Sequence, residues 1–197
     1  MCHTFRGWNF NKSGPERLFV NVLLMPFCYN DIGHPAGVTE KRIELVLQIT
    51  EGMEKNRFCV FSAGYSKNNP TKQCANRPIS LAYQMEKYVR DRQPPVSVRI
   101  YSQALGWGTL HEMLWAIRIA KSHFNFDDNT TVIVVSSEDH LPRIRKYARW
   151  VMPKDWWVQY HAIDHKLNEL WKERIKFWKD FPKLVWFRFK TALGFPL

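Results

Sequence analysis

The residues best suited to chemistry follow an apolar stretch in the sequence TTVIVVSSEDHLPR. They are the hydroxyls of Ser136 and Ser137, the imidazole of His140 and the guanidinium of Arg143. An imidazole titrates near neutral pH and can transfer protons, while a guanidinium binds phosphate or carboxylate oxygens in pairs. These side chains predict a site that binds an anion, or one in which His140 is a general acid or base. A nearby arginine would lower the pKa of His140 and keep the ring neutral.

The same stretch predicts a buried strand followed by a helix. Its continuous apolar run is typical of a parallel strand that is covered on both faces. Pro142 suits the first turn of a helix, so His140 is expected at the helix entrance, where free backbone N–H groups attract anions. The alternative is that His140 with Glu138 or Asp139 only caps the helix, and that Arg143 is a solvated surface cation.

Short apolar runs alternate with helical patterns along the rest of the chain. Further strands are predicted at Leu18–Met25, Arg57–Ser62, Ser97–Ser102 and Trp156–Ala162. Helices are predicted from Thr39, as N-cap, to Met53, from near Pro78, from Thr109, and after Arg143 with Ile144, Tyr147, Ala148 and Val151 facing the core. Parallel neighbours need crossovers of this length, so the pattern predicts an α/β domain with a mainly parallel sheet of five strands.

The ligand site of such a sheet is expected where successive crossovers leave to opposite faces. We place that point between the ends of the first and fourth strands, so that the turn Met25–Asp31 faces the His140 turn. Asp31 and His34 are then candidate ligand contacts. The polar loop Ser62–Arg77 is long enough to be a ligand cover.

Two other groups of residues have simpler explanations. Thr109 and Glu112 have the spacing of a helix capping box, which we favour over a catalytic pair. His161, Asp164 and His165 are expected to span a strand end and a helix start, so no metal site is predicted.

Composition limits the class of protein. At 197 residues with a net charge of +11, the chain suits one basic domain with an anionic partner. The four cysteines lack a CxxC spacing and are interpreted as buried thiols in a reducing compartment. Because no apolar run reaches the roughly 20 residues of a membrane span, a soluble, cytoplasmic protein is expected.

The C-terminal segment, residues 166–197, is basic and aromatic. A helix is predicted from His165 until Pro182 breaks it, with an apolar stripe at Leu167, Leu170, Trp171, Ile175 and Trp178. This segment could bind an anionic membrane surface peripherally, or pack on its own domain or on a partner subunit. Nucleic-acid binding is not favoured, because no recognised module is present.

Three motifs resemble a known family. FSAG (Phe61–Gly64), GWGTLHE (Gly106–Glu112) and VVSSEDHLPR (Val134–Arg143) follow strands in an order similar to that of the bacterial family of unknown function that includes YdcF, SanA and ElyC. The likeness covers Leu18–Ala162. It implies a three-layer Rossmann-like fold, a pocket for a nucleotide or S-adenosylmethionine and, for some members, a role in envelope biogenesis. It does not imply a particular reaction.

The resemblance also implies site residues. Those that match the family are Arg42, Ser62, Gly64, Thr109, His140 and Arg143. Two acidic positions of the family differ: one is Leu81 here, and the other is Ser102 or Gln103. The matching residues favour an enzyme of transferase or hydrolase type, and the two differences favour a ligand-binding or interaction protein without catalysis.

The predicted organisation is therefore an N-terminal extension over residues 1–17, an α/β domain over residues 18–165, and a basic helical extension over residues 166–197. The predicted ligand is a phosphorylated or nucleotide-like small molecule at the carboxyl edge of the sheet. His140 is the candidate catalytic residue. The candidate ligand contacts are Asp31, Arg42, Ser62, Gly64, Thr109, Ser136, Ser137 and Arg143.

Overall fold

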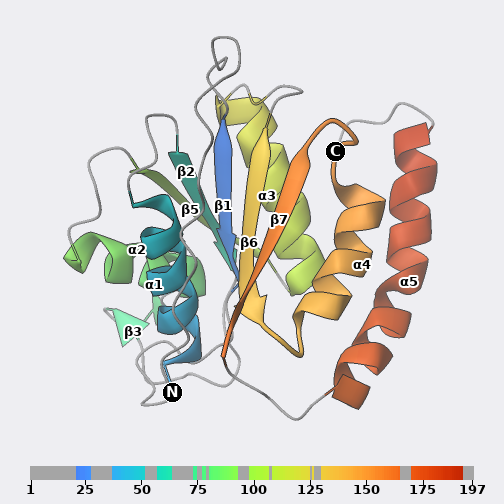
Figure 1. The fold of residues 1–197 in the computed structure, drawn as a ribbon. Helices are drawn as coiled ribbons and strands as arrows, with labels where there is room; N and C mark the ends of the chain where they lie inside the picture. The colour runs from blue at the N-terminus through green and yellow to red at the C-terminus, as the bar shows by residue number, and fades with distance from the viewer. Residues whose placement is uncertain are drawn as a thin grey trace, which may run out of the picture.

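The computed structural model describes residues 21–27, 37–51, 57–63, 73–74, 77–78, 80–92, 98–106, 108–124, 126, 130–164 and 170–192. One sheet of five parallel strands has the order β5-β2-β1-β6-β7 (Figure 1). Its strands are β1 (Val22–Pro26), β2 (Arg57–Ala63), β5 (Val98–Gly106), β6 (Thr131–Ser137) and β7 (Trp157–Ile163). The helices are α1 (Val38–Thr50), α2 (Leu81–Asp91), α3 (Thr109–Phe124), α4 (Leu141–Val151) and α5 (Leu170–Ala192). A separate antiparallel pair consists of β3 (Gln73–Cys74) and β4 (Arg77–Pro78). The predicted α/β class is confirmed.

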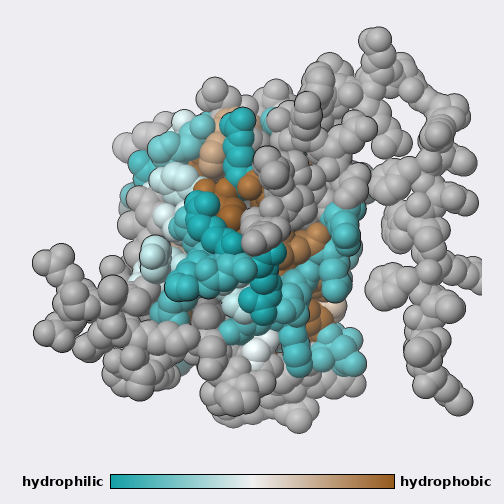
Figure 2. Space-filling model, turned by 90° about the vertical axis from the view of Figure 1, so that its left-hand side faces the viewer, coloured by the Kyte–Doolittle hydropathy of each residue, from teal (hydrophilic) through white to brown (hydrophobic). Residues whose placement is uncertain are grey.

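Helices cover both faces of the sheet because the strands are apolar on both sides. Successive side chains of a strand point to opposite faces. Leu24 of β1 packs in the core under α1 and α2, while its neighbours Leu23 and Met25 pack in the core under α3, α4 and α5. The outer side of α1 and α2 is mostly hydrophilic over the described residues, with smaller hydrophobic areas (Figure 2).

The crossovers change face between β1 and β6. These two strands are parallel neighbours with Pro26 beside Val135, and the backbone N–H of Phe27 donates to the carbonyl of Val135 at 3.2 Å. The chain leaves β1 for α1 on one face and leaves β6 for α4 on the other. The carboxyl ends of these two strands are therefore the topological switch point of the sheet, which is where the sequence placed the ligand site.

Two helix starts differ from the prediction. Thr39 is not the N-cap of α1: it lies buried in the first turn, and the cap is Gly37, whose φ of 51° is accessible to glycine at little cost. Helix α2 begins at Leu81, and the Ser80 hydroxyl caps it by accepting from the N–H of Tyr83 at 3.1 Å. Leu81, at a position that is acidic in the resembled family, is a buried core residue.

Helix α5 continues through Pro182, so the predicted break is wrong. Proline removes one helical N–H donor, but Pro182 is exposed and the helix is fixed on both sides of it. Phe177 before it and Leu184 after it are buried in the core shared with α4. Ile175 and Trp178 of the predicted apolar stripe are exposed and do not pack on their own domain. No helix among the described residues is long and apolar enough to cross a membrane.

Candidate functional site

His140 is buried at the end of β6 and caps α4, without a capping hydrogen bond from its side chain. Its Nδ1 lies 2.8 Å from Oγ of Ser136, and its Nε2 lies 2.7 Å from Nη2 of Arg143 and 3.0 Å from Oγ1 of Thr109. A guanidinium can only donate hydrogen bonds, so Nε2 must be the acceptor. The proton of the neutral ring is therefore on Nδ1, which donates to Ser136.

The pKa of His140 lies well below its ordinary value of 6.5. Burial is the largest cause, because it disfavours the charged ring, and the positive charges of Arg143, Arg42 and Lys176 act in the same direction. Arg143 thus lowers the pKa of His140 in the direction expected from the sequence, although burial has the larger effect. The same cations give the site a positive field.

Arg143 links the imidazole to the start of α3. One nitrogen, Nη2, donates to Thr109 Oγ1 at 3.1 Å as well as to His140. Thr109 is the first residue of α3, after Gly108, whose carbonyl accepts the first helical hydrogen bond, from the N–H of Glu112. The capping-box interpretation is therefore wrong, because it needs Thr109 to precede the helix. The hydroxyl instead belongs to the site.

Arg42 holds the two strand ends together beneath this group. It lies in α1 with 0% of its surface exposed. Its Nη1 donates to the carbonyl of Phe27 after β1, and its Nη2 donates to Ser137 Oγ at the end of β6, both at 2.7 Å. The ring of Phe27 meets that of His140 edge to face, with centroids 6.0 Å apart. Arg42 thus positions the backbone around the imidazole.

A second group, missed by the sequence analysis, supports Arg143 from α4 and α5. The guanidinium lies over the ring of Tyr147, 5.8 Å from its centroid, and the Tyr147 hydroxyl donates to Oδ2 of Asp180 at 2.6 Å. Burial raises the pKa of Tyr147, so the hydroxyl keeps its proton. Burial opposes ionisation of Asp180, but hydrogen bonds from Tyr147 and Lys183 outweigh it and lower the pKa of this carboxyl. The sequence signal that could have found this group is Tyr147, a tyrosine at a predicted core position of α4. A buried tyrosine hydroxyl usually has a hydrogen-bond partner.

The structure thus brings together most of the predicted residues that it describes. Ser136, Thr109, His140 and Arg143 form one hydrogen-bonded group. Ser137, the next residue after Ser136, accepts from Arg42 instead. Asp139, beside His140, is buried, and its Oδ2 has no hydrogen-bond partner among the described residues.

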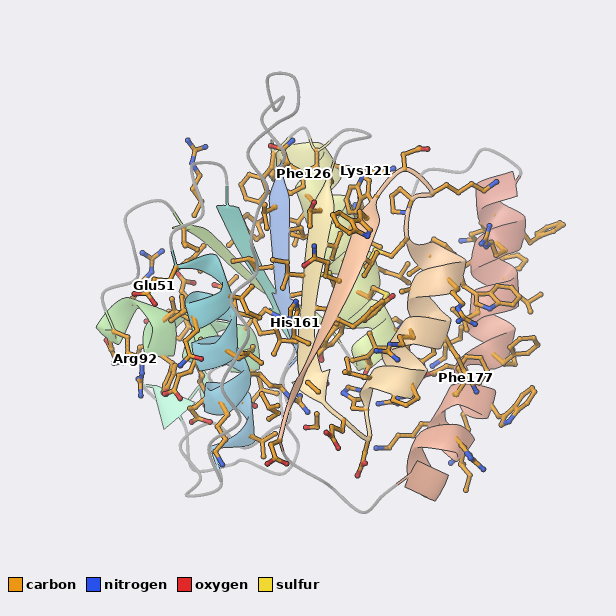
Figure 3. The ribbon with its side chains drawn as sticks, in the orientation of Figure 1. Glu51, Arg92, Lys121, Phe126, His161 and Phe177 are labelled. Atoms are coloured by element: carbon orange, nitrogen blue, oxygen red, sulfur yellow. The ribbon has the colours of Figure 1, made fainter. Side chains whose placement is uncertain are left out.

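Other predicted contacts cannot be placed in this group. Asp31, His34 and Gly64 lie outside the described residues, and Ser62 is described only as part of β2. His161 lies on β7, the edge strand beside β6 (Figure 3), where burial lowers its pKa, while His165 is outside the described residues. The described part of the chain holds no group of three or more His, Cys, Asp or Glu residues arranged to bind a metal ion.

Comparison of the chain with protein-family models, curated proteins and solved structures found no match. The resemblance to the family of YdcF, SanA and ElyC therefore stays a prediction that rests on the three quoted motifs.

Proposed function

We propose that this chain is a YdcF-like protein that binds a phosphorylated or nucleotide-like small molecule at the carboxyl edge of the sheet, between β1 and β6. The observation that carries the proposal is the contact of Arg143 Nη2 with His140 Nε2 and Thr109 Oγ1 at a sheet switch point. The strand order around β1 is that of a Rossmann-like fold, whose nucleotide ligands bind at this point. The cations around His140 favour an anion.

Arg143 is the residue that would change partners when the ligand binds. Its acceptors include a neutral ring nitrogen and a hydroxyl, whereas a phosphate group offers anionic oxygens that a guanidinium can bind in pairs. A phosphate group beside α4 would therefore draw the guanidinium away from His140. Tyr147 and Asp180 would keep Arg143 near the site.

His140 would then become available as a base. Once Arg143 turns to the anion, Nε2 loses the guanidinium donor and can accept a proton from water or from a substrate hydroxyl, with Thr109 Oγ1 beside it at 3.0 Å. Ser136 holds Nδ1–H on the opposite side of the ring and so maintains this tautomer. A bound anion also raises the pKa of the imidazole towards neutrality, which suits general acid and base catalysis. The reaction class supported is hydrolysis or group transfer at a phosphorylated centre.

A thermal-shift panel tests the proposal with inorganic phosphate, pyrophosphate, a nucleoside monophosphate, a sugar phosphate and S-adenosylmethionine, against chloride at equal ionic strength. A ligand at one hundred times its Kd raises Tm by about 5 to 10 °C for a domain of this size. The shift should vanish in Arg143→Ala and persist in Arg145→Ala, because Arg145 is an exposed arginine on the same helix. An equal shift in both variants would remove Arg143 from the site.

Turnover then separates an enzyme from a binding protein. Each stabilising compound is incubated with the wild type and with His140→Gln, and its products are separated by chromatography. Loss of the compound with wild type alone supports catalysis through His140. Binding without turnover would instead indicate a ligand-binding protein without catalysis.

A further inference from the structure

Helix α5 has two apolar faces, and only one of them is used by the fold. Its inner face packs on α4, where Phe177 and Leu184 are buried. Phe181 and Phe187 pack beside them and are half-buried. Phe177 also stacks on Tyr147, with ring centroids 5.8 Å apart. These contacts fix the orientation of α5 about its axis.

The outer face carries the other apolar side chains of the helix. Its exposed large residues are Ile175, Trp178, Val185, Trp186 and Phe189. At 3.6 residues per turn these positions fall within about 100° of the helix circumference, on the side away from Leu184. Trp178 is 66% exposed and Trp186 is 57% exposed. Trp186 stacks on Phe189 with centroids 5.9 Å apart, so these two rings form one aromatic surface.

A row of lysines borders this outer face. Lys179, Lys183 and Lys190 are exposed and fall next to Trp186 around the helix axis. Nζ of Lys190 lies 5.4 Å from the centre of the Trp186 ring. The sequence of α5 holds seven Lys or Arg residues and two Asp or Glu residues, and one of the acids, Asp180, accepts from Tyr147. The outer face is therefore aromatic on one side and cationic on the other.

We infer that the outer face of α5 binds the surface of an anionic lipid bilayer. Tryptophan and phenylalanine enter the boundary between headgroups and acyl chains, while lysine stems extend their ammonium groups towards lipid phosphates. The helix forms one edge of the molecule (Figure 1), and its 23 residues give it a length of about 35 Å, so it can lie flat in the membrane plane. An antiparallel pair with a second copy of the chain would bring two rows of lysines together, which disfavours that pairing.

This inference does not depend on ligand binding beside His140. The outer face points away from α4, and none of its five apolar residues contributes to the hydrogen bonds around His140. The proposal of membrane binding and the proposal of ligand binding can therefore be contradicted independently of each other.

The test is flotation of the full chain with vesicles of phosphatidylcholine, with and without phosphatidylglycerol. We expect binding only to the vesicles with phosphatidylglycerol, and less binding as salt rises. Trp178→Ser/Trp186→Ser should abolish binding, whereas Trp157→Ser should not, because Trp157 is 68% exposed but lies on β7. Lys179→Gln/Lys190→Gln should weaken binding about 30-fold, since each basic residue near such a surface contributes about 1 kcal/mol. Lys154→Gln, in the exposed turn after α4, is the matched charge control.

Unfolding of each variant is followed by circular dichroism, so that a folding defect is recognised. The inference would be overturned if Trp178→Ser/Trp186→Ser floated with the vesicles as well as the wild type does. It would also be overturned if the wild type floated equally with vesicles that contain phosphatidylglycerol and with vesicles that lack it. Sedimentation equilibrium tests whether the outer face instead joins two copies of the chain. A dimer that the two tryptophan changes convert to a monomer would assign the outer face to a second copy and would also overturn it.

Discussion

Replacing His140 by glutamine should change how the stability of the protein depends on pH. The pKa of the buried imidazole lies well below 6.5, because of burial and of the nearby cations Arg143 and Arg42. In the unfolded chain the ring regains its ordinary pKa. Between these two values the unfolded state binds one proton more than the folded state, so acid favours unfolding. The stabilising contribution of the neutral ring is therefore complete above pH 6.5 and is lost as the pH falls below it.

The magnitude follows from this one proton. From about pH 8 to about pH 5.5, wild type should lose about 1.4 kcal/mol of its free energy of unfolding through His140 alone. Glutamine cannot titrate, so His140→Gln escapes this loss. Other groups, including His161 with its lowered pKa, titrate in both proteins and cancel in the comparison. The stability difference between wild type and variant should therefore narrow by about 1.4 kcal/mol over this range.

Urea unfolding of both proteins across this pH range measures that difference. We expect His140→Gln to be the less stable protein at high pH, because it disturbs the contacts with Ser136 and Arg143, and to approach wild type as acid is added. A difference that stays constant with pH, or that widens in acid, would refute a buried, neutral His140.

Three further predictions concern the groups around this ring. Tyr147→Phe should lower the free energy of unfolding by about 1.5 to 3 kcal/mol, because it removes a hydrogen bond to the charged Asp180; urea unfolding measures this, and a loss below about 0.5 kcal/mol would contradict the link between α4 and α5. Arg42→Met should lower the free energy of unfolding by about 2 kcal/mol or more, since the Phe27 carbonyl and the Ser137 hydroxyl both lose a donor. An unchanged free energy of unfolding in guanidinium chloride would show that Arg42 does not hold the strand ends. Nitrogen-15 spectra of the imidazole should place the proton of His140 on Nδ1 at neutral pH, and a proton on Nε2 would contradict the assigned direction of the Arg143 bond.

The local part of the site could be predicted from the sequence because it is built from one short segment. His140 and Arg143 are three residues apart at a helix start, which places their side chains on one face of α4. The continuous apolar run of β6 identified a central strand, and strand ends of this kind hold the ligands of parallel sheets. Composition and spacing were therefore enough to place the two groups at the carboxyl edge.

The longer-range contacts could not be derived in this way. Arg42 reaches Ser137 across 95 positions of the chain, and Tyr147 reaches Asp180 across 33, so both contacts depend on how the helices pack. Arg42 entered the candidate site only through the family resemblance. Thr109 was assigned to a cap because the spacing to Glu112 fits one, and only the packing of α3 beside α4 shows that its hydroxyl meets His140.

Helix α5 was misjudged because it is apolar on two sides. A helical period identifies apolar positions but not which of two apolar faces meets the core. The sequence therefore left open whether Ile175 and Trp178 pack on the domain, whereas the structure exposes both and buries Phe177 and Leu184. Contacts with α4 on both sides of Pro182 keep that residue within the helix.

The central claim is that an anion binds through Arg143 beside His140. Isothermal titration with inorganic phosphate, on wild type, Arg143→Ala and Arg145→Ala, tests it most directly. We predict that Arg143→Ala raises Kd at least about tenfold, in line with the loss of charge-assisted hydrogen bonds, and that Arg145→Ala leaves Kd within about twofold of wild type. Equal affinities in Arg143→Ala and wild type would contradict the claim.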